Sequence, residues 1–159
     1  MTQRSDRPDF LWRPPRPTVP VKTGALILAL GRAQLTREQW NSEVDKVKLD
    51  YIAGSIERAA HTFLIWNWLS LWLGCLAVVA EGFETGYEHD HRLLDAVITE
   101  LLHSPHQKEL KRYRNKIFHP EPYDHDHVIR VLKALDTFIP WAENLHDEFV
   151  RFFQGYLSN

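Results

Sequence analysis

Apolar side chains recur every three or four residues along most of the chain, which is the spacing that places them on one face of an α-helix. Such stretches cover residues 21–35, 36 to about 81 and 91–103, and two more follow between residue 105 and the end. No stretch of the sequence alternates apolar and polar residues next to the turn residues of a hairpin. The pattern therefore predicts an all-α fold, a helical bundle over residues 21–159.

Local signals predict where these helices begin and end. Thr36 followed by Gln39 matches a capping box, so we expect a helix to start at Thr36. Gly82 and Gly86 are expected to end this long helix, because glycine is the usual residue just beyond a helix C-terminus. Asp90 is then expected to cap the next helix, since a carboxylate accepts hydrogen bonds from the first free amides.

Residues 59–80 of the long predicted helix carry no charged side chain. An apolar stretch of about 20 residues is long enough to cross a bilayer. Asn67 and Gly74 interrupt this one, however, and no lysine cluster flanks it. The helix either continues through this region or breaks near Gly54 or His61. We favour a helix buried inside a small soluble bundle over a membrane span.

The clearest helix start in the sequence lies at Ser104. Ser104 is a good N-cap, Pro105 suits the first helical position, and Gln107 stands where a capping box places its amide. Pro120 disfavours helical geometry at the residue before it, so the helix is predicted to cover 105–118.

The sequence predicts a helix near one end of the chain and an arm without regular structure at the other. Asp124 or Asp126 is expected to cap a last helix, which Pro140 should kink or break. Residues 1–20 hold five prolines and four arginines, so they are predicted to form an extended or disordered arm. Such an arm either contacts a partner or nucleic acid, or is a solvated tail.

The predicted helix 105–118 is basic within a chain whose formal net charge is -2. Its five cations are Lys108, Lys111, Arg112, Arg114 and Lys116. The one acid among them is Glu109. Leu110, Tyr113 and Ile117 follow one another at spacings of three and four, so they mark the buried stripe. Any surface for an anionic partner must therefore be local, and this helix is the candidate.

The end of that helix combines an arginine, an amide and a histidine, at Arg114, Asn115 and His119. The planar guanidinium of arginine fits phosphate oxygens, and histidine takes and gives protons near neutral pH. Pro120 releases His119 from the helix, so its ring can fold back towards Arg114 and share one phosphate with it.

Arginine, a polar residue, three further residues and histidine form the signature of the HEPN superfamily (higher eukaryotes and prokaryotes nucleotide-binding), which this chain resembles at Arg114, Asn115 and His119. The resemblance implies a HEPN-like bundle with the motif near the end of a late helix. Some relatives carry a tyrosine two residues after the histidine. Here that position is Glu121, and the nearest tyrosine is Tyr123.

The resemblance also implies an activity, since many relatives are metal-independent endoribonucleases of toxin–antitoxin and phage-defence systems. We accordingly expect Arg114, Asn115 and His119 to be catalytic, with no cofactor and no catalytic metal. Residues expected to contact RNA are Lys108, Lys111, Arg112, Lys116 and Tyr123. The expected partners are RNA, a second copy of the chain in a homodimer whose two motifs face one another, and an antitoxin protein.

Other interpretations stay open from the sequence. Arg114 and His119 can bond and cap the end of their helix without any catalytic role. Some HEPN-like chains are silent modules that bind a nucleotide or a partner protein. From a different class altogether, the chain can be a small membrane-associated helical protein.

Two further clusters contain metal-binding residue types. They are Glu88-His89-Asp90-His91 and Asp124-His125-Asp126-His127. Histidines and carboxylates of this kind bind zinc and other divalent ions. Both clusters fall at predicted helix starts, where aspartates serve as caps, so we expect no metal site in either.

The cysteine count and the first twenty residues indicate the cellular compartment in which the protein is expected. The single cysteine, Cys75, cannot form an internal disulfide, and the first twenty residues lack the apolar segment of a signal peptide. We therefore expect a cytoplasmic protein. Trp66, Trp68 and Trp72 stand at helical spacing in the uncharged stretch, where core or dimer surface is a simpler role than a stacking platform for bases.

Overall fold

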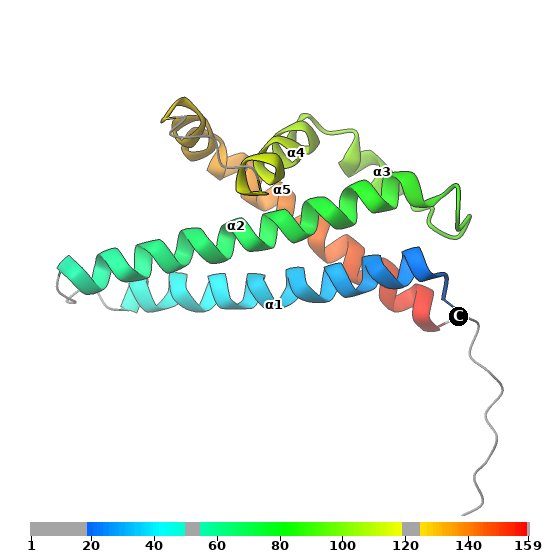
Figure 1. The fold of residues 1–159 in the computed structure, drawn as a ribbon, viewed down its shortest axis with the longest axis horizontal. Coiled ribbons are helices and arrows are strands. Elements are labelled where there is room, and N and C mark those ends of the chain that lie inside the picture. Colours follow the sequence, from blue (N-terminus) through cyan, green and yellow to red (C-terminus); the bar gives the residue numbers. More distant parts are fainter. Residues whose placement is uncertain (1–18, 50–54, 119–124, 159) are drawn as a thin grey trace, which may run out of the picture.

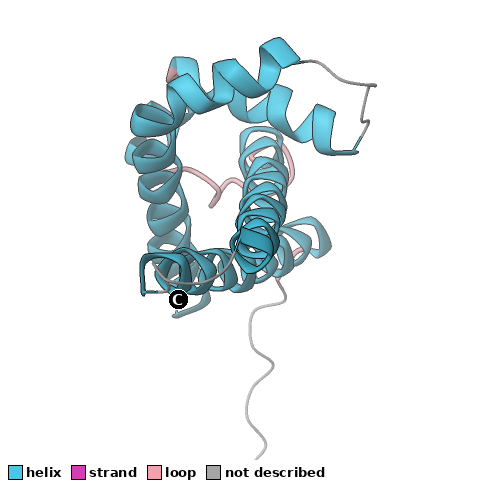
Figure 2. Cartoon of the chain, turned by 90° about the vertical axis from the view of Figure 1, so that its left-hand side faces the viewer, coloured by secondary structure: helices cyan, strands magenta, loops and turns pink. Residues whose placement is uncertain are grey.

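The computed structural model describes residues 19–49, 55–118 and 125–158, with side chains placed for 19–47, 60–115 and 136–158. Across these ranges the chain forms only helices joined by loops and turns (Figures 1 and 2), which confirms the all-α prediction. The helices are α1 (Val21–Leu49), α2 (Ser55–Gly86), α3 (Ala96–Leu102), α4 (Pro105–Phe118) and α5 (His125–Ser158). Most of the Pro/Arg-rich arm, residues 1–18, lies outside the described residues.

Helices α1 and α2 lie side by side and run in opposite directions, and α2 also contacts α4 and α5 (Figure 1). The uncharged stretch of α2 supplies much of the core, and Trp72 at its middle is fully buried. The other buried apolar residues of this stretch are Leu69, Leu73, Leu76, Ala77, Val79 and Ala80. The absence of charge along α2 therefore follows from its position among three other helices.

Thr36 does not start a helix, as its capping box predicted, but lies in the interior of α1. Its hydroxyl donates to the carbonyl oxygens of Arg32 (2.9 Å) and Ala33 (3.0 Å), which is a common arrangement for threonine inside a helix. Leu30 and Ala33 before it are buried in the core, and Trp40 after it is partly buried there. The apolar face is thus continuous through Thr36, and packing outweighs the local capping signal.

Gly82 does not end α2 either, because the helix continues to Gly86. A Cβ atom at Gly82 would overlap the side chain of Leu26 in α1. The glycine instead permits the two helices to approach closely at this point. The prediction for Gly86 is confirmed, since α2 ends there.

The helix predicted over 91–103 is shorter and begins later. Asp95 rather than Asp90 is its N-cap, accepting hydrogen bonds from the backbone N–H groups of Val97 (2.9 Å) and Ile98 (3.0 Å). The helical spacing of apolar residues over 91–103 predicts Leu94 and Val97 on the core face, but both are exposed. They are exposed because residue 94 precedes the helix and Val97 lies on its outer face.

Pro140 does not break α5, which runs as one helix from His125 to Ser158. The missing N–H of proline removes one backbone hydrogen bond from a helix interior, at a cost of about 3 kcal/mol. The flanking residues Phe138, Trp141 and Ala142 are buried, so packing against the bundle compensates for that loss. Asp124 lies outside the described residues, so the cap of α5 stays a prediction.

Candidate functional site

Helix α4 is fixed on the bundle by its buried face. Ser104 caps it as predicted, accepting a hydrogen bond from the backbone N–H of His106 (3.3 Å). Leu110 and Tyr113 are buried, and the Tyr113 hydroxyl lies 3.0 Å from the Ser70 hydroxyl of α2. The predicted buried stripe is thus confirmed at two of its three positions, and the side chain of Ile117 lies outside the described set.

Gln107 differs from its prediction. It is buried, and within the described part of the chain neither its Nε2 nor its Oε1 atom has a hydrogen-bond partner. It therefore does not complete a capping box with Ser104. The helix start depends on Ser104 and Pro105 alone.

Arg114 lies on the flank of α4 and is held by two residues. Its Nε and Nη2 atoms donate to Oδ1 of Asn115 (3.3 and 3.0 Å), and its Nη1 atom donates to Oε2 of Glu81 in α2. The Arg114 side chain is 30% exposed and that of Glu81 is 29% exposed. The site thus presents one oriented, half-exposed guanidinium, to which Asn115, its neighbour in the predicted motif, is hydrogen-bonded.

The other cations of α4 are largely compensated. Lys111 pairs with Glu84 of α2 (2.8 Å), and Arg112 pairs with Glu109 (2.8 Å). Lys108 is exposed and makes no ion pair with the residues whose side chains are described. The surface of α4 is therefore less positive than its own sequence predicts, because α2 contributes Glu81 and Glu84.

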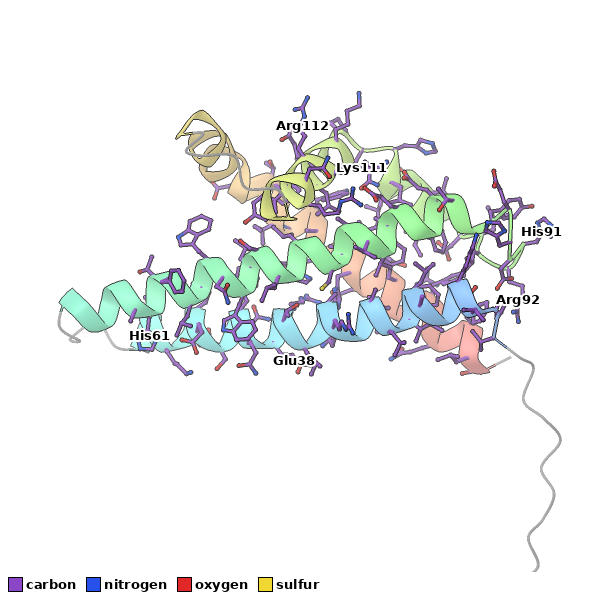
Figure 3. All side chains as sticks on the ribbon, in the orientation of Figure 1. Glu38, His61, His91, Arg92, Lys111 and Arg112 are labelled. Atoms are coloured by element: carbon purple, nitrogen blue, oxygen red, sulfur yellow. The ribbon has the colours of Figure 1, made fainter. Side chains whose placement is uncertain are left out.

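Three predicted site residues are not placed by the structure. His119 and Tyr123 lie outside the described residues, and so does the side chain of Lys116. The meeting of His119 with Arg114 over one phosphate accordingly stays a prediction. Figure 3 shows Lys111 and Arg112 on α4, well separated from His91 and Arg92 beyond the end of α2.

The first histidine–aspartate cluster does not converge on a common point. His89 lies 2.5 Å from Nζ of Lys22, and the His91 ring packs edge-on against Tyr87. Across the described part of the chain no group of three or more histidine, cysteine or carboxylate side chains is arranged to hold a metal ion. The side chains of the second cluster, residues 124–127, lie outside the described set.

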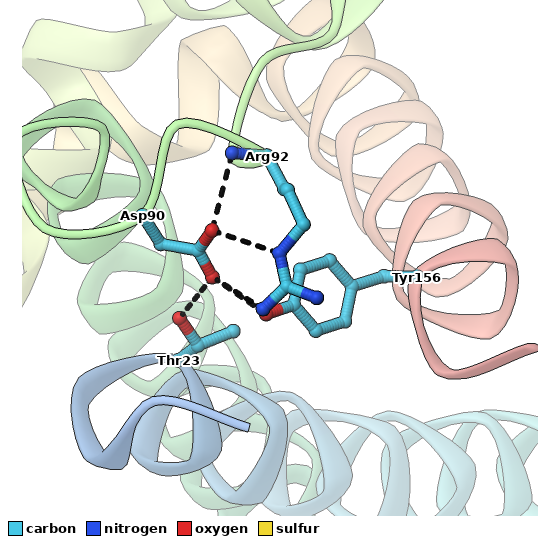
Figure 4. Close-up of polar contacts among 4 residues, drawn as sticks. All are labelled: Thr23, Asp90, Arg92 and Tyr156. Atoms are coloured by element: carbon cyan, nitrogen blue, oxygen red, sulfur yellow. Dashed lines mark hydrogen bonds and ion pairs between the residues drawn. The ribbon is translucent and has the colours of Figure 1, made fainter. Parts of the chain in front are cut away.

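Asp90 has a structural role that the sequence did not reveal. Its carboxylate is buried and accepts hydrogen bonds from the Thr23 hydroxyl (3.1 Å), the Tyr156 hydroxyl (2.5 Å) and the Arg92 guanidinium (3.1 and 3.3 Å), as Figure 4 shows. These four residues, here called the Asp90 cluster, join the loop after α2 to α1 and α5. Burial alone would raise the pKa of Asp90, but hydrogen bonds from Arg92, Tyr156 and Thr23 outweigh it and lower the pKa to about 2.

His146 of α5 is the second polar group that sequence reasoning missed. It is fully buried, accepts a hydrogen bond at Nδ1 from Trp72 Nε1 (3.1 Å), and lies 2.7 Å from Gln34 Oε1 through Nε2. Because Nδ1 accepts, the neutral ring must carry its proton on Nε2 and donate it to Gln34. Burial and, to a smaller extent, the nearby Arg37 cation together lower the pKa of His146 to about 4.

One segment of α2, Ala60–Gly86, is long and apolar enough to cross a membrane by length and composition alone, with a mean hydropathy of 1.9. The core helix of a soluble protein has the same length and composition, and 44% of the apolar part of this segment is buried inside the bundle. Within this segment Cys75 is half-buried, and burial raises the pKa of its thiol. A raised thiol pKa disfavours the thiolate that a nucleophile needs.

Comparisons with models of known protein families, with curated proteins and with solved structures give no match to this chain.

Proposed function

We propose that this protein is a metal-independent endoribonuclease of the HEPN type, working as a cytoplasmic homodimer in a toxin–antitoxin or phage-defence setting. The observation that carries the proposal is the half-exposed guanidinium of Arg114, which Asn115 orients within the same motif. Its position on a capped helix, four residues before the helix end at Phe118, matches the place that the family resemblance gives to the motif.

The proposed chemistry uses the RNA as its own nucleophile. The 2′-hydroxyl oxygen attacks the adjacent phosphorus as the bond from phosphorus to the 5′-oxygen breaks, leaving a cyclic 2′,3′-phosphate and a 5′-hydroxyl. His119 removes the proton of the attacking hydroxyl or protonates the leaving oxygen, and in a dimer the two copies divide these roles. Arg114 stabilises the charge that grows on the phosphate oxygens.

Purified protein incubated with cellular RNA in the presence of a chelator tests this proposal. We expect cuts that leave cyclic phosphate ends in the wild type, and a loss of about 100- to 1,000-fold in rate for Arg114→Ala or His119→Ala, as for removal of a charge-stabilising or proton-transferring group. Light scattering should give a mass twice the 18.7 kDa of the chain. Cleavage that persists undiminished in His119→Ala would contradict the assignment.

A catalytically silent HEPN-like module that binds a nucleotide or a partner protein is the second candidate. The observation that favours it is the neutralisation of positive charge on the α4 surface. Lys111, Arg112 and Arg114 are all paired with carboxylates there. Paired cations attract a polyanion less strongly than free ones. Binding of nucleotide or protein without any RNA cleavage would favour this module over the nuclease.

A membrane-associated helical protein is the third candidate, and the segment Ala60–Gly86 is the observation behind it. Expression followed by fractionation without detergent separates this candidate from the other two. Recovery of folded protein in the soluble fraction would exclude it, whereas recovery only from membranes would exclude the bundle-core interpretation of α2.

A further inference from the structure

Among the residues whose side chains are described, Asn115 and Glu81 engage only part of the Arg114 guanidinium. Arginine carries five N–H donors in a planar group. Asn115 takes the Nε donor and one on Nη2, and Glu81 takes one on Nη1. One N–H on each terminal nitrogen therefore has no partner among these two residues. Donors on the two terminal nitrogens can bind two oxygens of one phosphate.

We propose that Glu81 is a positioning residue for Arg114, which it holds from α2 so that the two open N–H donors face the scissile phosphate. This inference rests on the proposed ribonuclease function and adds to the motif a residue that the motif does not contain. Asn115 fixes one edge of the guanidinium from within α4, and Glu81 fixes the other side from a neighbouring helix. With both contacts in place, the plane of the guanidinium is set before RNA binds.

A purely stabilising role is a poor explanation of this ion pair. About 30% of each side chain is exposed, so solvent still reaches the pair, and ion pairs within reach of solvent contribute about 0–1 kcal/mol to folding. A carboxylate next to a phosphate-binding arginine also repels the phosphate. Glu81 should therefore weaken RNA binding slightly while it raises the rate of the chemical step, because orientation matters most in the transition state.

Steady-state cleavage of one RNA by matched variants tests this division between binding and rate. For Glu81→Ala we expect kcat to fall by about 10- to 100-fold, the effect of displacing a reacting group by about 1 Å, with KM unchanged or lower. Glu81→Gln keeps an oxygen that can accept from Nη1, so it should retain most of the rate. Glu84→Ala removes the neighbouring ion pair with Lys111 and should leave kcat unchanged. Wild-type kcat in Glu81→Ala, or an equal loss in Glu84→Ala, would overturn the inference.

A measurement without RNA separates this inference from the proposed function. The nitrogen–proton NMR signal of Arg114 Nε, assigned by its loss in Arg114→Lys, reports whether the guanidinium is held. It should be sharp and slow to exchange in the wild type and in Glu84→Ala, and broadened in Glu81→Ala. An unchanged signal in Glu81→Ala would overturn the positioning role. If the wild-type chain cleaves no RNA while the signal broadens in Glu81→Ala, the nuclease is refuted and the hold of Glu81 on Arg114 is established.

Discussion

At the loop after α2 and on the surface of α4, carboxylates pair with cationic side chains, but the first carboxylate is buried and the others lie near solvent. Asp90 is buried and accepts hydrogen bonds from three side chains that belong to α1, α5 and its own loop. On α4, Arg114 and Lys111 each meet a carboxylate of α2 at the solvent boundary. Burial makes the first group necessary for the fold, because an unpaired buried charge is costly. The second group is reached by solvent, so its ion pairs should contribute little to folding.

This comparison separates buried residues that should stabilise the bundle from surface residues that should contribute little to its stability. Substitutions in the buried clusters should change the free energy of unfolding strongly, and substitutions on α4 should change it little. Urea titration measures the free energy of unfolding of each variant, which compares the two regions on one scale.

The largest effect is expected at His146 and depends on pH. Its folded pKa of about 4 lies below the ordinary value of 6.5, so the unfolded chain binds more protons between these two pH values. The stability contributed by the neutral ring is complete above pH 6.5 and is lost as the pH falls towards 4, by about 3 kcal/mol in all and about 2 kcal/mol between pH 7 and pH 5.

His146→Gln is the control for that pH dependence. Its amide can accept from Trp72 and donate to Gln34 without titrating, so it should show a smaller loss of stability between pH 7 and pH 5 than the wild type. Equal slopes in the two proteins would show that the buried ring is not the origin of the effect.

The second effect is expected for Asp90→Asn. The amide keeps the size of the carboxylate but not its charge, so the hydrogen bonds from Arg92 and Tyr156 weaken, and we expect a loss of about 2 kcal/mol at pH 7. Asp147→Asn is the matched control, because Asp147 is 63% exposed and its ion pair with Arg37 should matter by less than about 0.5 kcal/mol. Similar losses in the two variants would contradict the distinction between buried and exposed pairs.

Acid should weaken the Asp90 cluster as well. The folded pKa of Asp90, about 2, is lower than its ordinary value of 3.8. Its contribution is therefore present above pH 3.8 and is lost as the pH falls from 3.8 towards 2. This range lies below that of His146, so the two clusters lose their contributions one after the other in an acid titration.

A third, smaller effect contrasts two glycines within helices. Gly82→Ala adds a methyl group that overlaps Leu26, and this overpacking should exceed the gain in helix propensity and leave a net loss of about 1 kcal/mol. Gly31 of α1 has open space where a Cβ would lie, so Gly31→Ala should instead stabilise the protein by about 0.5–1 kcal/mol. Stabilisation by Gly82→Ala would show that the close approach of α1 and α2 is not tight.

The sequence predicted the helices where the helical spacing of apolar residues extends over a long stretch. It failed where a local signal conflicted with packing. Helix α4 was predicted at both ends, because Ser104, Pro105 and Pro120 act through backbone geometry that no neighbour can change. Thr36 and Gly82 carried equally clear local signals, but Thr36 lies inside a helix whose buried residues continue on both sides of it, and Gly82 lies against Leu26 of α1. Such contacts join residues distant in sequence, so a local pattern cannot reveal them.

The same limit applies to the candidate site. Arg114 and Asn115 are adjacent in the motif, and their contact was within reach of the sequence. Glu81 lies 33 positions away on another helix and carries no signal of its own, since a glutamate after an apolar stretch is ordinary. The Asp90 cluster was missed for the same reason, because Thr23 and Tyr156 lie more than sixty positions from Asp90.

The smallest effect on stability is expected at the residue with the largest expected effect on activity. Arg114→Ala removes a half-exposed ion pair and two hydrogen bonds with the exposed Asn115, so the free energy of unfolding should change by less than about 1 kcal/mol. Urea titration of this variant beside Asp90→Asn makes the comparison direct. If Arg114→Ala destabilised the protein as much as Asp90→Asn does, the arginine would serve the fold, and a loss of RNA cleavage in that variant would no longer indicate catalysis. A stable Arg114→Ala protein that has lost cleavage would instead assign the residue to the reaction, because a residue that stabilises the fold cannot be removed without lowering the free energy of unfolding.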